Sequence, residues 1–379
     1  MGIYEDLGVR RGINARGNQT LLGGSTPPPE VQAAMDEALS SWVSFEELLR
    51  KSGDYIAKTL GAESAFVTSG AAAAIALGSA AALAGDDRDK IARLPDTSGM
   101  KNEFVFQKCQ NYGYKRCFTI SGAKLIEVGG ESGCTADQIE SAIGPNTAAI
   151  AYFESGRWGD NMVSLDEARR IADKHNVRLV VDAAGQIYPL DRFQRVAQTG
   201  DVVAFGAKYF GSPHSTGILA GRRVWVESAF QQNFLGFEVA GQQGLARPFG
   251  RGFKTDRNEV VGVVAALKRW FTMNHEDRIA MEDAKRTAIA SALRGVPGVK
   301  PWIPTGPLIG PNIVVHVAID PQVTGKTASE VLAELEAGDP PIWARSSDGG
   351  RSVSIGVQVL TDEEVTIVAR RLREILEAR

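Results

Sequence analysis

The sequence predicts an α/β protein with a large, mostly parallel sheet domain and a smaller α/β domain at the C-terminal end. Short apolar runs alternate with helical patterns along most of the chain, which is typical of parallel strands covered by helices on both faces. The 379 residues, 44% hydrophobic and 23% charged, are enough for two domains and a large core. Two of the apolar runs also lead into chemically reactive side chains, Asp182 and Lys208.

The N-terminal part predicts an arm followed by two helices, a strand and a third helix. Residues 1–29 are punctuated by glycines and by three consecutive prolines, which favours an extended arm. Helical periodicity begins at Pro29 and runs to residue 38, and a second helix covers 45–60 and ends at a glycine. An apolar run at 64–68 predicts a strand, which leads into an alanine-rich helix that ends near residue 83.

Further strands and helices follow at similar spacing. The expected strands are 104–106, 124–128, 147–153, 177–182, 201–205 and 217–220. The expected helices are 165–175, capped by Ser164, and 257–275, which leads into the second domain. That domain is predicted to contain strands 313–319 and 352–357 and helices 327–337 and 361–377. We therefore expect an arm at 1–29, a large domain at 30–275 and a small domain at 276–379.

Composition and charge narrow the classes of partner. The net charge of −3 and the pI near 5.9 provide no general basic field for nucleic acid. Cys109, Cys117 and Cys134 lack the spacing of metal ligands and predict reduced thiols. The acidic start has no signal-peptide core, and the longest apolar stretch, 71–85, is too short to span a bilayer. We expect a cytoplasmic protein with no metal, membrane or nucleic-acid partner.

Lys208 and Asp182 predict chemistry on an aldehyde cofactor. Each follows an apolar strand, and doubly wound sheets bind ligands at the carboxyl ends of their strands. An amine there can form a Schiff base with pyridoxal phosphate, while a carboxylate keeps the pyridine nitrogen protonated. Asp182 could instead cap a helix, and Lys208 could be a solvated loop lysine. Because both residues occur together among apolar and small neighbours, the pair favours the cofactor.

The turn Ser69-Gly70-Ala71 is the candidate phosphate site. It opens a helix directly after a strand, so that small residues let backbone N–H groups approach an anion at the positive end of the helix dipole. A merely tight strand-to-helix turn has the same composition. With Lys208 and Asp182 in the same chain, the phosphate interpretation is favoured.

Five segments of the chain carry a resemblance to a known family. They read INARGNQTLLGGS at 13–25, EELLRKSGDYIAKTLGAESAFVTSGAAAAIAL at 46–77, VVDAAGQ at 180–186, GDVVAFGAKYFGSPHSTGILAGRR at 200–223 and GRGFKTDRNEVVGVVAAL at 250–267. The chain resembles the selenocysteine synthase (SelA)-like family of fold-type I enzymes, and within it the D-glucosaminate-6-phosphate ammonia-lyase group. This resemblance implies the aspartate aminotransferase-like fold, pyridoxal 5'-phosphate as cofactor, and at least a homodimer with its active sites at the subunit interface.

The resemblance also implies roles for individual residues. Lys208 and Asp182 become the catalytic pair, and the cofactor phosphate is held by Ser69, Gly70 and Ala71 with contributions from Ser215 and Thr216. Arg251 and Lys254 become candidates for binding a substrate carboxylate or phosphate, although they could equally form a solvated basic loop. Arg345 is a further candidate for the substrate carboxylate, with a structural surface arginine as the alternative. His214, close to Lys208 in sequence, is a candidate acid or base.

The chain departs from the family pattern at three places. Gly70 and Ala72 replace hydroxyl residues in the phosphate turn, so backbone amides must bind more of the phosphate. The segment before Lys208 is one residue shorter than usual and lacks a serine. Where relatives place a His-Arg pair over the cofactor ring, this chain has the segment 109–112, which leaves Gln110 or Tyr112 as the candidate for stacking.

The leading hypothesis is abstraction of the Cα proton followed by β-elimination, on a small polar amino acid or amino-sugar acid. The alternatives are selenium transfer to seryl-tRNA, an aldolase, racemase or aminotransferase reaction, and a non-catalytic ligand-binding protein. The phosphate turn begins at residue 69, which leaves no room before it for the extra N-terminal domain expected of a tRNA-binding selenocysteine synthase. Retention of both Lys208 and Asp182 argues against the binding protein.

Overall fold

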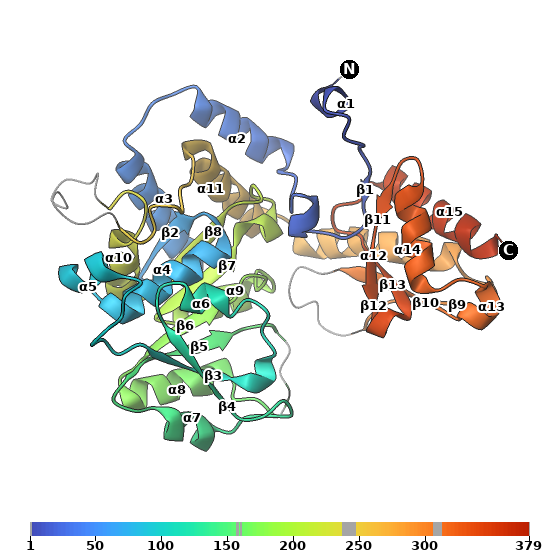
Figure 1. The fold of residues 1–379 in the computed structure, drawn as a ribbon. Coiled ribbons are helices and arrows are strands. Elements are labelled where there is room, and N and C mark those ends of the chain that lie inside the picture. Colours follow the sequence, from blue (N-terminus) through green and yellow to red (C-terminus); the bar gives the residue numbers. More distant parts are fainter. Residues whose placement is uncertain (1, 157–158, 160, 237–247, 306–312, 379) are drawn as a thin grey trace. The chain divides into compact units, whose positions relative to one another are not determined.

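The protein, seen here as a computed structural model, divides into two compact units (Figure 1). The structure describes residues 2–156, 159, 161–236, 248–305 and 313–378. The larger unit comprises residues Thr26–Phe271. The smaller unit combines Met1–Ser25 with Thr272–Arg379. The N-terminal arm therefore belongs to the same compact unit as the C-terminal part of the chain.

A seven-stranded sheet forms the centre of the larger unit. Its strands are β2 (Ser64–Thr68), β3 (Glu103–Gln107), β4 (Lys124–Val128), β5 (Thr147–Phe153), β6 (Arg178–Asp182), β7 (Val202–Gly206) and β8 (Gly217–Gly221). Their order across the sheet is β2-β8-β7-β6-β5-β3-β4. Strand β8 runs antiparallel to β2 and β7 on either side of it, and the other neighbouring pairs are parallel. The predicted α/β class with a mostly parallel sheet is confirmed. The strands at 64–68, 124–128 and 147–153 match their predicted bounds.

Helices cover this sheet because its central strands are apolar on both faces. In β6, Leu179, Val180 and Val181 are all fully buried. The helices of the unit are α2 (Pro29–Leu39), α3 (Phe45–Leu60), α4 (Gly70–Ala84), α5 (Arg88–Arg93), α6 (Arg116–Thr119), α7 (Ala136–Ala142), α8 (Leu165–His175), α9 (Leu190–Thr199), α10 (Arg223–Gln231) and α11 (Arg257–Thr272). Ser164 caps α8 by accepting a hydrogen bond from Glu167 N at 3.2 Å, as predicted.

The predicted helix 257–275 is wrong in its extent. Helix α11 ends at Thr272, and a new helix, α12 (His275–Ala292), begins after two intervening residues. The side chain of Asn274 caps α12 by accepting hydrogen bonds from Glu276 N at 3.0 Å and Asp277 N at 3.3 Å. The predicted range thus included the cap of the next helix, and α12 itself was not predicted.

The smaller unit contains a four-stranded antiparallel sheet in the order β12-β13-β10-β9. Its strands are β9 (Val299–Trp302), β10 (Val314–Ile319), β12 (Arg345–Ser347) and β13 (Ser352–Gly356), and its helices include α12, α13 (Pro321–Thr324), α14 (Ala328–Ala337) and α15 (Asp362–Glu377). The arm is not extended throughout, because it contains a short helix, α1 (Ile3–Asp6). Strand β1 (Ile13–Asn14) of the arm pairs in parallel with β11 (Ile342–Trp343). The arm is thus an integral part of this unit.

Within the described residues, every helix is too short or too polar to cross a bilayer. Cys109, Cys117 and Cys134 are all free thiols.

Candidate active site

Asp182 and Lys208 lie at the carboxyl edge of two neighbouring parallel strands. Asp182 ends β6 and pairs with Ala204 of β7, while Lys208 lies on the 3-10 turn η3 (Ala207–Phe210) that follows β7. Ala183 N donates to Ala204 O at 2.9 Å, and Gly206 N donates to Ala184 O at 2.9 Å. The backbone thus holds the two strand ends side by side beyond the end of the β6–β7 pairing, at the edge where open α/β sheets bind ligands.

The carboxylate of Asp182 is buried, with only 4% of the residue exposed. One oxygen, Oδ1, accepts a hydrogen bond from Ala184 N at 2.9 Å, and Oδ2 accepts one from the hydroxyl of Tyr112. Burial raises the pKa of Asp182, and these two hydrogen bonds act in the opposite direction. A buried carboxylate of this kind is stabilised when a positive charge is placed against it, which is what a protonated pyridine nitrogen provides.

Lys208 is half-buried, and burial lowers the pKa of its amine. Its Nζ lies 5.2 Å from the centre of the Tyr209 ring. Burial lowers the pKa of the His214 imidazole, and the positive charge of the nearby Lys208 lowers it further. Its Nδ1 is buried and has no hydrogen-bond partner in the part of the chain that the structure describes. The site therefore holds an amine and an imidazole whose pKa values are both lowered by burial.

The predicted phosphate turn has the conformation that an anion site requires. Ser69 occupies the N-cap position of α4, but its side chain makes no capping hydrogen bond. Gly70 has a φ of +88°, which favours glycine at this position. The buried Thr68 fixes the turn, since its Oγ1 donates to Gly70 O at 3.0 Å. The first amides of α4 and the hydroxyl of Ser69 are thus available to an oxyanion at the positive end of the helix.

Strand β8 brings the second phosphate segment to this turn. Thr68 pairs with Gly217, and a Cβ atom on Gly217 would lie only 2.5 Å from Gly70 C and 2.7 Å from Ala71 N. Ser215 and Thr216, which precede Gly217, therefore lie beside the turn. The hydroxyl of Thr216 forms its hydrogen bonds within its own loop.

The loop 212–216 is held by its own hydroxyl groups. Thr216 Oγ1 donates to Pro213 O at 2.6 Å and lies 2.8 Å from Ser212 Oγ. Ser215 is exposed, and its Oγ donates to Glu259 Oε1 at 2.5 Å. In this conformation Thr216 shapes the loop, and Ser215 is the hydroxyl that remains at the surface.

These three features together fit pyridoxal phosphate. Lys208 would supply the amine for the aldehyde, Asp182 the carboxylate for the ring nitrogen, and the turn at Ser69 the donors for the phosphate. The close packing of Gly217 against Gly70 leaves no room for a side chain there, so the cradle is formed by backbone.

The candidate substrate-binding residues lie in other parts of the fold. Arg251 and Lys254 lie on the loop before α11, where Gly250 N donates to Gln232 O at 2.7 Å and fixes the turn against the end of α10. Arg345 belongs to the smaller unit, at the start of β12.

Sequence reasoning did not foresee several contacts of this site. The Tyr112 hydroxyl donates to Asp182, the Gln110 amide bridges the backbone of Phe153, and stacking of either residue on the cofactor ring stays a prediction. Thr68 was placed in the phosphate turn without a role, and neither its hydrogen bond to Gly70 nor the packing of Gly217 against the turn was foreseen. A threonine directly before Ser-Gly is a usable signal, but contacts across strands have no local signature.

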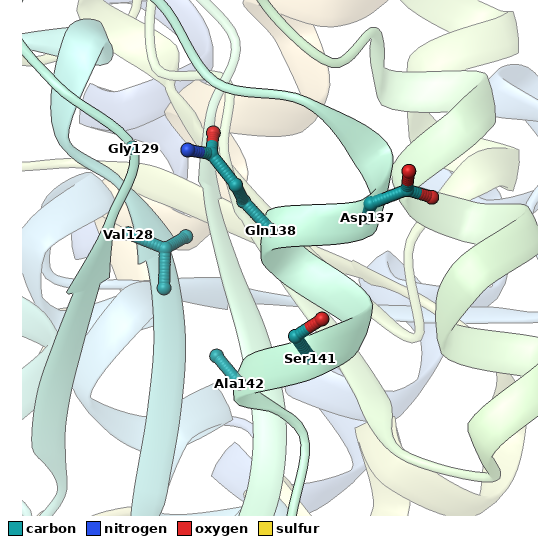
Figure 2. A pocket seen from close by; sticks show the side chains of 6 residues that line it. All are labelled: Val128, Gly129, Asp137, Gln138, Ser141 and Ala142. Carbon is teal, nitrogen blue, oxygen red and sulfur yellow. The ribbon is translucent and has the colours of Figure 1, made fainter.

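A surface hollow lies elsewhere on the larger unit. Figure 2 shows that it lies between β4 and α7, and its lining residues are Val128, Gly129, Asp137, Gln138, Ser141 and Ala142. In the sheet order, β3, β5 and β6 separate β4 from β7. This hollow is therefore remote from Lys208 and contains a single carboxylate and no basic group.

Comparison with known proteins places the chain among related enzymes. It is 32% identical to a D-glucosaminate-6-phosphate ammonia lyase from Salmonella typhimurium (strain 14028s / SGSC 2262), an alignment that covers 99% of this chain and 98% of the relative. It is 30% identical to a 5'-C-glycyluridine monooxygenase-decarboxylase from a Streptomyces species, over 98% of this chain and 92% of the relative. An L-seryl-tRNA(Sec) selenium transferase from Solidesulfovibrio magneticus (strain ATCC 700980 / DSM 13731 / RS-1) is 25% identical, over 96% and 82% respectively.

The solved structures that resemble this chain include an enzyme of the same name as the 32% identical relative. A structure of D-glucosaminate-6-phosphate ammonia-lyase matches with a TM-score of 0.83 and 29% identity, covering 100% of this chain and 98% of that chain. A NifS-like protein matches with a TM-score of 0.60 at 17% identity, which shows the shared fold. No family model matches the chain.

Proposed function

The chain belongs to the D-glucosaminate-6-phosphate ammonia-lyase family, a SelA-like group of fold-type I enzymes, and on that premise we propose that it is a pyridoxal-phosphate-dependent ammonia lyase. Its substrate is a small polar amino acid or an amino-sugar acid. The observation that carries the proposal is the position of Lys208 beside the buried Asp182, at the carboxyl ends of β7 and β6. The 32% identical relative is named for the same chemistry.

Each residue of the site has a separate role in this reaction. Pyridoxal phosphate, when bound, supplies a ring that stabilises negative charge at the substrate Cα. Asp182 keeps the ring nitrogen protonated, and Tyr112 orients that carboxylate through its hydroxyl. Lys208 would hold the cofactor through its amine, and the same amine, when free, would take the proton from the substrate Cα. The lowered pKa of Lys208 suits this role, because the neutral amine is the base.

The overall reaction breaks the Cα–H bond and the bond from Cβ to its leaving group. For a β-hydroxy substrate the leaving group departs as water, with the proton supplied by an acid in the site. Lys208 carries the proton taken from Cα and can return it to the leaving group, and His214 remains the candidate for a further acid or base. The enamine product then takes up water and yields a keto acid and ammonia, so that the net products contain every atom of the substrate.

We also propose that the enzyme is a cytoplasmic homodimer or larger homo-oligomer without nucleic-acid partners. The connection between α2 and α3 carries exposed apolar side chains, with Trp42 89% exposed, Val43 56% and Leu39 53%. Such a patch is typical of a surface that binds another protein. The net charge of −3 supports the absence of a nucleic-acid partner.

The test is to purify the protein, record its visible spectrum, and reduce it with borohydride before peptide mass mapping. We expect an absorbance band that becomes a pyridoxyl adduct on Lys208. The holoenzyme is then incubated with D-glucosaminate-6-phosphate and with a panel of β-hydroxy amino acids. The released ammonia and keto acid are both measured, and we expect them in equal amounts. Lys208→Ala should abolish both products, while Lys174→Ala, at an exposed lysine that pairs with Glu140, should leave them unchanged.

Parallel assays separate the rival activities. Consumption of oxygen with release of carbon dioxide would replace the lyase by the chemistry for which the 30% identical relative is named. Transfer of the amino group to an added keto acid would show an aminotransferase, and specific retention of seryl-tRNA in a gel shift would favour selenium transfer. A protein with no visible band even after pyridoxal phosphate is added would contradict the assignment of the cofactor.

A further inference from the structure

The side chain of Ser215 connects the loop 212–216 to the first turn of α11 in the larger unit. Its hydroxyl donates a hydrogen bond to Oε1 of Glu259 at 2.5 Å. A hydroxyl has a single proton to donate, and a hydrogen bond to a carboxylate is stronger than one between neutral groups. In this conformation the proton of Ser215 is therefore committed to Glu259.

The backbone of Ser215 lies beside the predicted phosphate turn. Its carbonyl oxygen would be 3.9 Å from a Cβ atom placed on Gly70, the glycine of the turn with a φ of +88°. Gly217, two residues further on, packs so closely that a Cβ there would lie 2.7 Å from Ala71 N. Ser215 thus adjoins the amides that are predicted to bind the cofactor phosphate, while its side chain is bound to Glu259.

A second hydrogen bond holds Glu259 in this position. Its other oxygen, Oε2, accepts from Asp256 N at 2.9 Å. Asp256 directly precedes α11 and Glu259 is the third residue of that helix, so this contact is one half of a capping box. Because the cap fixes the carboxylate at the start of the helix, Oε1 remains the acceptor for the Ser215 hydroxyl.

The Glu259 carboxylate and a phosphate at the turn would compete for the same proton. Both are anionic acceptors, and Ser215 can donate to only one of them at a time. Thr216 does not replace it in this conformation, because its Oγ1 donates to Pro213 O at 2.6 Å. The phosphate therefore either binds without the Ser215 hydroxyl or first has to break its hydrogen bond to Glu259, and both cases reduce the affinity for the phosphate.

We propose that Glu259 is a positioning residue that lowers the affinity of the apoenzyme for pyridoxal phosphate by withholding the Ser215 hydroxyl from the phosphate turn. The inference rests on the proposed function, because the phosphate concerned is that of the proposed cofactor. The contact between the loop and α11 thereby influences how readily the enzyme gains and loses its cofactor.

The experiment is a double-mutant cycle on the dissociation constant of pyridoxal phosphate. The apoenzyme is titrated with the cofactor at physiological ionic strength, and binding is followed by visible absorbance. Glu259→Gln keeps an oxygen for Asp256 N and turns its amide NH2 group toward Ser215, which then accepts a hydrogen bond and has its own proton free for the phosphate. We expect this variant to bind the cofactor about tenfold more tightly than the wild type, because a charge-assisted hydrogen bond no longer competes.

The Ser215→Ala background separates the hydroxyl from the charge. Without the hydroxyl, Glu259→Gln should change the dissociation constant only about twofold, since the remaining effect of the lost charge acts through screened solvent. Glu364→Gln is the matched control, because Glu364 Oε2 accepts from Thr361 N at 2.8 Å in the same capping position of α15. It should bind the cofactor as the wild type does, and circular dichroism verifies that every variant is folded.

The outcomes distinguish this inference from the assignment of the cofactor and of the reaction. If Glu259→Gln weakens binding, or changes it by the same factor with and without the Ser215 hydroxyl, the role of Glu259 is overturned and the cofactor stands. If neither the wild type nor any variant binds pyridoxal phosphate, both are overturned. A loaded enzyme that releases no ammonia and yet shows the expected coupling would refute the lyase reaction and support the role of Glu259.

Discussion

Replacing Gly217 by alanine tests whether the turn at Ser69 binds the cofactor phosphate. The new Cβ would lie 2.5 Å from Gly70 C, 2.7 Å from Ala71 N and 2.8 Å from Phe205 O. All three atoms belong to the backbone, so no change of side-chain rotamer can relieve the contacts. The turn must move by about 0.9 Å to restore an ordinary 3.4 Å separation from Gly70 C.

The displacement should cost both stability and cofactor affinity. Overpacking a well-packed site costs about 1–3 kcal/mol of unfolding free energy. Loss of one charge-assisted hydrogen bond from the turn to the phosphate costs about 1.5–3 kcal/mol of binding free energy. Because about 1.4 kcal/mol corresponds to a tenfold change, the dissociation constant of pyridoxal phosphate should rise roughly 10- to 150-fold. The assay is titration of the apoenzyme with the cofactor, followed by visible absorbance.

Gly78→Ala is the matched control for this prediction. Gly78 lies within α4, and a Cβ there would meet Val202 Cγ1 at 2.4 Å, away from the phosphate turn. This variant should lose comparable stability and keep its affinity for pyridoxal phosphate. The reasoning is refuted if folded Gly217→Ala binds the cofactor as the wild type does, or if Gly78→Ala weakens binding equally.

Three further predictions concern the same site. Thr68→Val removes the hydrogen bond to Gly70 O and should lower the unfolding free energy by about 0.5–1.5 kcal/mol in denaturant titrations, with weaker cofactor binding; unchanged values would show that this bond does not fix the turn. Burial lowers the pKa of Lys208, so the rate at which the apoenzyme takes up the cofactor should rise with pH through a midpoint below 10.5; a midpoint at or above that value would contradict a desolvated amine. Because the pKa of Asp182 is raised in the folded apoprotein, the folded state binds this proton more tightly than the unfolded chain does. Asp182 therefore lowers the free energy of unfolding as the pH rises from the ordinary aspartate pKa to the raised pKa of the folded state. Asp182→Asn, whose amide can still bond to Tyr112, should therefore stabilise the apoprotein at neutral pH more than at acidic pH while abolishing ammonia release, and thermal unfolding at both pH values measures the difference.

Much of the larger unit could be predicted from local patterns. The apolar runs at 64–68 and 147–153 gave the bounds of β2 and β5, and the cap at Ser164 gave the start of α8, because these signals lie within a few neighbouring residues. Lys208 and Asp182 were identified for the same reason, since each follows a recognisable buried strand. The predicted helix 257–275 ran past the end of α11 at Thr272, and α12, which begins after the cap at Asn274, was not predicted.

The sequence by itself determined the α/β class, the parallel sheet and the two residues that predict the cofactor. Only the tertiary structure decided which distant side chains meet them. Tyr112 donates to Asp182 across 70 residues of chain, and β1 of the N-terminal arm pairs with β11 of the C-terminal part. Local patterns specify which residues enter a strand, whereas the partner of each strand is fixed by burial of the whole sheet and by closure of long loops, whose cost depends only weakly on their length.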